Sequence, residues 1–181
     1  IVAANVSRQR PEYFSVQHTP QVAVADAVRM SISIPMFFEA LQFDGERFGS
    51  GDYYVDGGLY DNFPIAIFDD PQFAQQSWAY REGINWETLG LFLYPEAVKN
   101  TTKPIMPKNV WAFSSLMVQS LYRAYEVSGY QTNPVDKRRT IEISDCGIPA
   151  TEFSITQGSE KFQRLYESGR NAAQRFFAEM K

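Results

Sequence analysis

A single acidic side chain, Asp56, stands between a run of strand-forming residues and two glycines. The residues Tyr53-Tyr54-Val55 precede it and Gly57-Gly58 follow it. Aromatic and β-branched residues favour strands, and glycine permits the positive φ of a sharp turn, so this pattern predicts a carboxylate at a strand end. Catalytic groups are often held on such short loops between rigid elements. An Asp-Gly hairpin turn is the alternative interpretation of the same residues.

The residues after the two glycines predict the start of a helix. Asn62 offers a capping side chain, and Pro64 lacks the N–H group that a first helical turn leaves unpaired. We therefore expect a short helix over residues 64–69, with Asp56 on the loop between the strand and this helix.

Composition excludes several classes of protein. A chain of 181 residues that is 44% hydrophobic is long enough for one globular domain with a sizeable core. The net charge of −4 argues against a nucleic-acid partner, which requires clustered Lys and Arg. Cys146 is the sole cysteine and His18 the sole histidine, so we expect no disulfide, no metal site and a surface or structural histidine.

The apolar runs of the sequence and its first residues bear on the location of the protein. The chain has no apolar run near the roughly 20 residues that span a bilayer, so we expect a soluble, cytoplasmic or peripheral membrane protein. The first residue is Ile1, and residues 1–5 read as a buried strand with no turn before it. We therefore expect that a leader or a larger upstream segment precedes this chain.

The periodicity of apolar residues predicts an alternation of strands and helices, which indicates an α/β fold. The expected strands cover residues 1–5, 37–43, 53–56, 89–94 and 139–144, and the expected helices cover residues 19–32, 64–69, 110–125 and 162–177. Residues 89–94 suit a parallel strand buried on both faces, and the apolar stripe of residues 110–125, followed by Gly129 as a stop, suits a core helix. Residues 70–87 read as an irregular excursion. There is no internal repeat or linker, so a second domain is not expected.

Two blocks of the sequence resemble the patatin-like phospholipases. Residues 25–38 contain small residues, then Ile34-Pro35, then Phe37-Phe38, and residues 55–64 contain Asp-Gly-Gly followed by Asn-x-Pro. The resemblance covers residues 1 to about 95 and is weaker from about 100 to 181. It implies a three-layer α/β/α sandwich that lacks its N-terminal strands, with residues 1–181 forming the C-terminal portion of a single catalytic domain.

The resemblance also implies a lipid acyl hydrolase of the phospholipase A or esterase type, which uses a Ser-Asp dyad and no cofactor. Asp56 matches the acidic member, and Gly57 and Gly58 match its supporting loop. The carboxylate would take the proton of the serine hydroxyl as that hydroxyl attacks an acyl carbonyl. The expected substrate is a lipid or other ester, met at a membrane surface to which the protein binds peripherally.

The nucleophile of the family is not matched in this chain. A Gly-x-Ser-x-Gly elbow needs glycines four residues apart, and the one such pair, Gly45 and Gly49, has Arg47 at its centre. The glycine-rich oxyanion loop is also unmatched, because Gly57-Gly58 already belongs to the Asp56 turn. In the family both motifs lie N-terminal to the blocks found here. We therefore expect an N-terminal segment with the serine elbow, in the same protein or in a companion chain.

Three further interpretations follow from these residues. Met36, Phe37 and Phe38 could line an acyl channel, although core packing explains a Phe-Phe pair equally well. A Ca²⁺ loop formed by Asp52, Asp56 and Asp61 is a weak alternative, since the spacing departs from the alternate-residue pattern of an EF-hand. The alternative to an enzyme is a non-catalytic lipid-binding or interaction module that keeps the fold.

Overall fold

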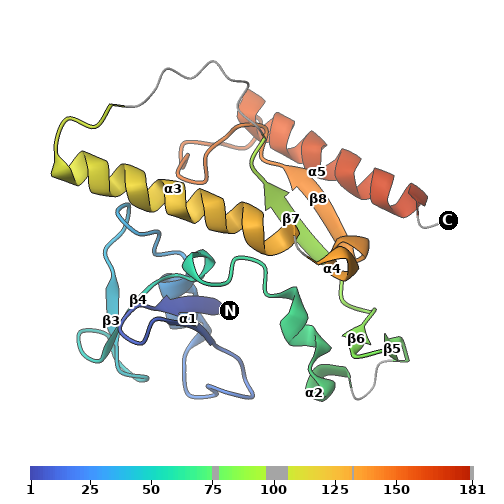
Figure 1. The fold of residues 1–181 in the computed structure, drawn as a ribbon, viewed down its shortest axis with the longest axis horizontal. Helices are drawn as coiled ribbons and strands as arrows, with labels where there is room; N and C mark the ends of the chain where they lie inside the picture. Colours follow the sequence, from blue (N-terminus) through green and yellow to red (C-terminus); the bar gives the residue numbers. More distant parts are fainter. Residues whose placement is uncertain (75–77, 97–105, 132, 180–181) are drawn as a thin grey trace. The chain divides into compact units, whose positions relative to one another are not determined.

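The computed structural model describes residues 1–74, 78–96, 106–131 and 133–179 (Figure 1). Its contacts divide the chain into two compact units. The first comprises Ile1–Phe63 with Met106–Gly129, and the second comprises Pro64–Ile105 with Tyr130–Lys181. Both units contain strands and helices, so the predicted α/β class is confirmed. The assignment of all 181 residues to part of one catalytic domain stays a prediction.

The first unit is built on a four-stranded antiparallel sheet with the order β2-β1-β4-β3. The strands are β1 Val2–Asn5, β2 Arg10–Tyr13, β3 Leu41–Phe43 and β4 Asp52–Asp56. The strands expected at residues 1–5 and 53–56 are confirmed. The expected strand over residues 37–43 is wrong in its first four residues, because Phe37 and Phe38 donate backbone N–H groups to the Ile34 carbonyl and form a turn instead.

The helix α1 Val24–Ser31 packs on this sheet. Its expected start near Thr19 is wrong. The Thr19 side chain accepts the Ser15 N–H at 3.1 Å and closes a separate turn, so the helix begins only after Ala23. The helix ends before Pro35 as predicted, because the helical conformation is disfavoured for a residue that precedes a proline.

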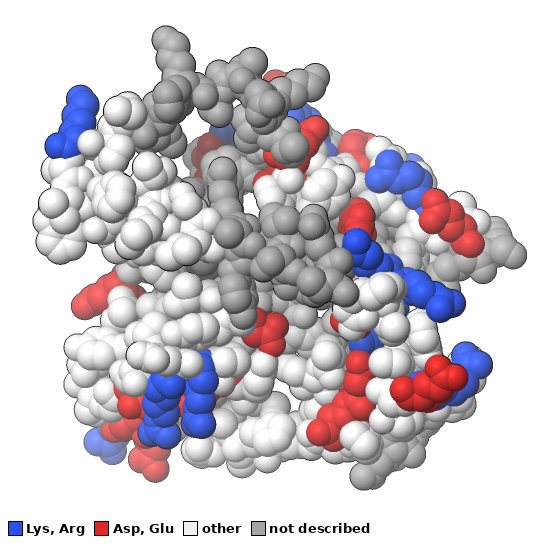
Figure 2. Space-filling model, viewed as in Figure 1, with Lys and Arg blue, Asp and Glu red and all other residues white. Residues whose placement is uncertain are grey.

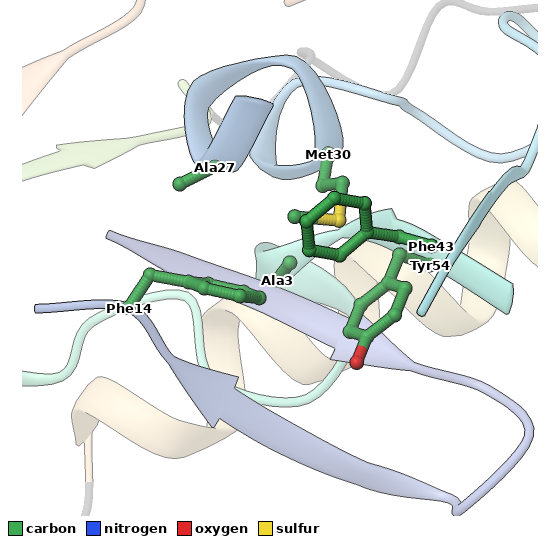
Figure 3. Packing of buried hydrophobic residues seen from close by; sticks show 6 residues of the cluster. All are labelled: Ala3, Phe14, Ala27, Met30, Phe43 and Tyr54. Atoms are coloured by element: carbon green, nitrogen blue, oxygen red, sulfur yellow. The ribbon is translucent and has the colours of Figure 1, made fainter. Parts of the chain in front are cut away.

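The core of the first unit lies between α1 and the sheet (Figure 3). Met30 of α1 is fully buried, and its side chain points at the ring of Phe43. The rings of Phe43 and Tyr54 are 6.4 Å apart and meet edge to face, a favourable geometry for aromatic pairs. The full cluster is Ala3, Phe14, Ala27, Met30, Phe43 and Tyr54. This packing fixes β4, which carries Asp56 at its end.

The longest helix, α3 Val110–Gln131, confirms the predicted helix but not its expected end or its burial. It continues through Gly129, where a stop was predicted. Several members of the apolar stripe are exposed, namely Val110, Phe113, Met117 and Leu121. Periodicity identifies a helix and its apolar face, but it does not identify the surface that covers that face.

The second unit contains the parallel pair of β7 Gly90–Tyr94 and β8 Thr140–Ser144. The helix α5 Glu160–Glu179 packs on β8 and buries Ala172. Both strands, a parallel sheet as the setting of β7, and this closing helix were predicted, whereas the pairing of β7 with β8 was not. Burial of β7 on both faces is wrong, because Phe92 is 5% exposed but Leu91 is 64% exposed. A strand is buried on both faces only where other elements pack on both faces. The helix α5 packs on the partner strand β8, and Leu91 of β7 remains exposed.

Shorter elements complete the second unit. They are η2 Ile65–Asp69, α2 Pro71–Ala74, β5 Tyr80–Arg81, β6 Ile84–Asn85 and α4 Pro134–Arg138. The excursion expected over residues 70–87 is therefore partly regular, with 75–77 outside the described residues. Its hairpin turns at Glu82 and Gly83, both with positive φ, which matches the twist of a two-residue connection.

Charged side chains of opposite sign stand next to one another on the face drawn in Figure 2. In the first unit, Arg8 contacts Asp52 at 2.5 Å and Arg10 contacts Glu12 at 3.3 Å. Among the described residues, no helix combines the length and the apolar character that crossing a membrane demands.

Candidate active site

Asp56 is the last residue of β4, and it is held there from two sides. It pairs with Ala3 of the central strand β1. Its backbone N–H donates to the Ser33 carbonyl at 2.9 Å, just after the end of α1. Its side chain is half-buried, whereas Val55 before it is in the core. The backbone of Asp56 is thus fixed by the sheet and by the helix end, and its carboxylate leaves the sheet at a defined point.

The two glycines after Asp56 form the 3₁₀ turn η1 Gly57–Leu59. The Gly58 N–H donates to Asp56 Oδ1 at 2.8 Å, so the carboxylate caps the turn that follows it. The expected positive φ at these glycines is wrong, since neither is among the residues with positive φ. The hairpin interpretation is also wrong, because the chain enters η1 instead of folding back as a paired strand.

Gly57 is required for a different reason, the close approach of another backbone segment. A Cβ atom at this position would stand 2.3 Å from the carbonyl oxygen of Val2 and 2.7 Å from its carbonyl carbon. Only glycine fits at that separation. The loop that follows Asp56, residues 57–61, is called the Asp56 loop below. It therefore lies directly on the start of β1.

The loop is closed by hydrogen bonds within residues 57–61. The N–H groups of Tyr60 and Asp61 both donate to the Gly57 carbonyl, at 3.1 and 3.0 Å. The hydroxyl of Tyr13, on the edge strand β2, donates to Asp61 Oδ2 at 2.6 Å. Tyr13 was not among the residues predicted from the sequence, because the contact joins residues 48 positions apart and no local pattern marks it. The expected capping role of Asn62 is wrong, since η2 begins after Pro64 without a side-chain cap.

Met36, Phe37 and Phe38 lie on the turn that follows Ser33 and are exposed. The rings of Phe37 and Phe38 are 5.2 Å apart and meet edge to face. Met36 has a φ of 66°, a conformation that a side chain of this size rarely adopts outside a tight turn. The interpretation that the Phe pair packs in the core is therefore wrong. A role of these residues in holding an acyl chain stays a prediction.

The opposite end of β4 has different chemistry. Asp52 accepts from Asn5 Nδ2 at 2.9 Å and from Arg8 Nε at 2.5 Å. These hydrogen bonds, that from Asn5 first, lower the pKa of Asp52, although burial alone would raise it. The buried Tyr54 hydroxyl donates to Glu12 at 2.6 Å, and burial followed by this carboxylate raises the pKa of Tyr54. Asp52 is thus part of a structural network that ties β1, β2 and β4 together.

The remaining candidates from the sequence have other surroundings. His18 is exposed, as predicted, and its Nδ1 lies 3.0 Å from the Ser15 hydroxyl. Asp52 and Asp56 lie at opposite ends of one strand, and Asp61 accepts from Tyr13. In the part of the chain that the structure describes, no three His, Cys, Asp or Glu side chains are grouped to hold a metal ion. The Ca²⁺ loop is therefore not supported.

Residues 1–69 match the model of the family described as Patatin-like phospholipase. The matched segment contains all four strands of the first sheet and the whole loop from Asp56 to Asp61. No solved structure matches the chain significantly.

Three curated proteins illustrate the similarity. "Uncharacterized protein R571" of Acanthamoeba polyphaga mimivirus is 41% identical over 172 residues, which cover 93% of this chain and 50% of the relative. "Probable lipid hydrolase 463L" of Invertebrate iridescent virus 6 is 27% identical over 67 residues, covering 37% of this chain and 21% of the relative. "Uncharacterized protein YqhO" of Bacillus subtilis (strain 168) is 28% identical over 157 residues, covering 84% and 46%. The chain spans half or less of the length of these relatives.

Proposed function

We propose, on the premise that residues 1–69 place this chain in the patatin-like phospholipase family, that it forms part of a lipid acyl hydrolase with Asp56 as general base. The nucleophilic serine would lie on a segment outside this chain, in the same protein or in a companion chain. The enzyme would be a carboxylic ester hydrolase of the phospholipase A or esterase type. The iridescent virus relative is named a probable lipid hydrolase, and this name supports the substrate class.

The observation that carries this proposal is the placement of Asp56 within the family-matched segment. Its backbone is fixed by Ala3 and Ser33, and its Oδ1 accepts the Gly58 N–H at 2.8 Å. A general base must be held in one orientation toward the proton that it takes. A carboxylate at a rigid strand end, anchored through one oxygen, meets that requirement.

In the proposed reaction, the Asp56 carboxylate accepts the proton of the serine hydroxyl while the serine oxygen attacks the acyl carbonyl. The carbonyl becomes a tetrahedral oxyanion, which backbone N–H groups of the segment outside this chain would stabilise. Collapse expels the alcohol, which takes the proton back from Asp56, and leaves an acyl-serine. Water then attacks the acyl carbon while Asp56 takes a proton from it, the bond from the acyl carbon to the serine oxygen breaks, and Asp56 returns the proton to that oxygen, which gives the free acid and the serine hydroxyl.

A non-catalytic lipid-binding or interaction module is the second candidate. The sequence of the complete protein discriminates between the two, because a Gly-x-Ser-x-Gly elbow in it would favour the hydrolase and a replaced serine would favour the module. The two candidates differ in one property, since only the hydrolase should turn over an ester.

The decisive experiment is Asp56→Asn in the complete protein, because this change keeps the shape of the side chain and removes the base. We expect ester hydrolysis to fall by at least about 10²- to 10⁴-fold, the usual contribution of general-base catalysis. The melting temperature should stay near that of the unmodified protein. Turnover retained in Asp56→Asn would exclude the proposed role of Asp56.

Two control variants accompany this experiment. Asp52→Asn, at the other end of the same strand, should lower turnover much less. His18→Gln should leave turnover nearly unchanged, since the proposed dyad has no histidine. A large loss of activity in His18→Gln would point instead to a mechanism in which a histidine is the base.

A further inference from the structure

The hairpin of β1 and β2 contacts the Asp56 loop at both ends of that loop. Val2 and Tyr13 are cross-strand partners in the hairpin. The Val2 carbonyl lies against Gly57, the first residue of the loop. The Tyr13 hydroxyl donates to Asp61, the last residue of the loop, at 2.6 Å. One pair of cross-strand residues therefore holds the loop at its start and at its end.

The hydrogen bond between Tyr13 and Asp61 has the character of a strong one. Its acceptor is a carboxylate, and its length of 2.6 Å falls in the range of charge-assisted O–H···O⁻ bonds. Both residues are half-buried, so water competes less for the two groups than it would on an open surface. The bond is therefore able to hold Asp61 against the motion of a short loop.

The position of Asp61 is passed to Asp56 through the backbone of the loop. The Asp61 N–H donates to the Gly57 carbonyl, which closes the turn. The N–H group of the same peptide unit, that of Gly58, donates to Asp56 Oδ1. If the end of the loop moved, the turn would open and this donor would leave the carboxylate. The orientation of Asp56 then depends on a hydroxyl that does not contact it directly.

We propose that Tyr13 is a positioning residue for Asp56, acting through its hydrogen bond to Asp61 and the closed turn of residues 57–61. This inference rests on the proposed function, since it concerns how the general base of that reaction is held. Tyr13 would not touch the substrate.

The test compares variants of the complete protein in steady-state ester hydrolysis. We expect Tyr13→Phe to lower kcat by about 10- to 100-fold, the range for losing a hydrogen bond to a charged group, with KM nearly unchanged. The acidic limb of the pH–kcat profile should move to higher pH, because a carboxylate that loses an N–H donor is more easily protonated. Tyr53→Phe is the matched control, because Tyr53 is exposed on β4 of the same sheet, and it should behave as the unmodified protein.

Variants at Asp61 separate the hydrogen bond from other effects. Asp61→Ala removes the acceptor and should match Tyr13→Phe, whereas Asp61→Asn keeps an acceptor oxygen and should lose less. The double variant Tyr13→Phe with Asp61→Ala should be no worse than either single variant, since both remove one interaction. Hydrogen exchange at the Gly58 amide should be faster in Tyr13→Phe and unchanged in Tyr53→Phe.

Each result supports or overturns the inference. Unmodified kcat and unmodified Gly58 exchange in Tyr13→Phe, with Asp56→Asn inactive, would overturn it while leaving the proposed function intact. A loss of kcat that is matched by global unfolding, or additive losses in the double variant, would also overturn it. Retained turnover in Asp56→Asn would instead refute the proposed function, and Gly58 exchange would still show whether Tyr13 holds the loop.

Discussion

The backbone N–H of Asp56 donates to the carbonyl oxygen of Ser33 at 2.9 Å, which joins the end of β4 to the end of α1. Ser33 is buried, and its hydroxyl donates in turn to the Arg29 carbonyl at 2.8 Å, so the acceptor is itself held by the helix. Residues 25–38 and 55–64, the two blocks that carry the family resemblance, therefore meet at one junction. The resemblance reflects a physical contact that places Asp56.

The contact between Gly57 and Val2 predicts the effect of a single methyl group. Gly57→Ala would place a Cβ atom 2.3 Å from the carbonyl oxygen of Val2, which cannot move without disturbing the pairing of β1 with β2. We expect the free energy of unfolding to fall by about 1–3 kcal/mol, the usual cost of overpacking, with a loss of activity in the complete protein. Chemical denaturation measures this change.

Gly169→Ala is the control for this prediction. Gly169 lies inside α5, and nothing stands within 4 Å of the position that its Cβ would occupy. Alanine there should raise the free energy of unfolding by about 0.5–1 kcal/mol, through helix propensity. If the two variants had equal stability, the proposed steric role of Gly57 would be wrong.

The sequence predicted the strand that carries Asp56 and the two long helices because their signals are local. A β-favouring run before two glycines defines β4 and its end, and the 3.6-residue periodicity defines α3 and α5. The strongly apolar run of β7 indicated a strand of a parallel sheet, but it did not identify β8 as the partner strand. The fold class and the position of the candidate base could therefore be predicted.

The features that could not be predicted depend on contacts between residues distant in sequence. Gly57 is needed because Val2 approaches it, and Asp61 is held because Tyr13 reaches it across 48 positions. Neither contact leaves a mark in the neighbouring residues. The exposure of Phe37 likewise depends on the turn at Ile34, which a count of apolar residues reads as a strand.

The second unit is predicted to depend on a buried arginine. The Arg139 guanidinium is 3% exposed and forms a bidentate pair with Asp69, with both distances 2.6 Å, and a further bond of 2.7 Å to Asp136. Burial alone would lower the pKa of Arg139, but the two carboxylates raise it, so the side chain stays charged. It also donates to the Asn85 carbonyl at 3.1 Å, which links η2, β6 and the start of β8.

Arg139→Met should therefore destabilise the chain by about 3–5 kcal/mol, because it leaves two partly buried carboxylates without their cation. Arg138→Met is the matched control. Arg138 is exposed and lies over the ring of Trp86 at 5.5 Å, a contact worth about 0.5–1 kcal/mol at such a site. Equal losses in the two variants, measured by denaturant unfolding, would contradict this assignment.

The carboxylate of Glu152, before α5, predicts that the stability of the folded state falls in acid. Glu152 pairs with Lys161 and accepts from Ser154, and these contacts, Lys161 first, lower the pKa of Glu152 from 4.5 to about 2. A lowered pKa stabilises the folded state above the ordinary value of 4.5, and this stabilisation is lost as the pH falls toward about 2. Lys161→Met should move the titration midpoint of Glu152, followed by carboxyl carbon NMR, back toward 4.5. Lys108→Met should leave the midpoint where it is.

The exposed aromatic pair beside the Asp56 junction predicts a preference for substrate in a membrane. Phe37 and Phe38 follow Ser33 by four and five positions and are 51% and 44% exposed. The transfer of aromatic side chains from water to the boundary between lipid head groups and acyl chains is favourable. The net charge of −4 offers no general attraction to anionic lipid. In the complete protein, Phe37→Ser with Phe38→Ser should lower hydrolysis of phosphatidylcholine vesicles by about tenfold or more and leave hydrolysis of a short-chain monomeric ester within about twofold. Val16→Ser, which changes an apolar side chain that is 77% exposed elsewhere in the same unit, should change neither rate. Equal losses on vesicles and on the monomeric ester would mean that the pair acts on the reaction itself, and unchanged rates on both would exclude it from contact with lipid.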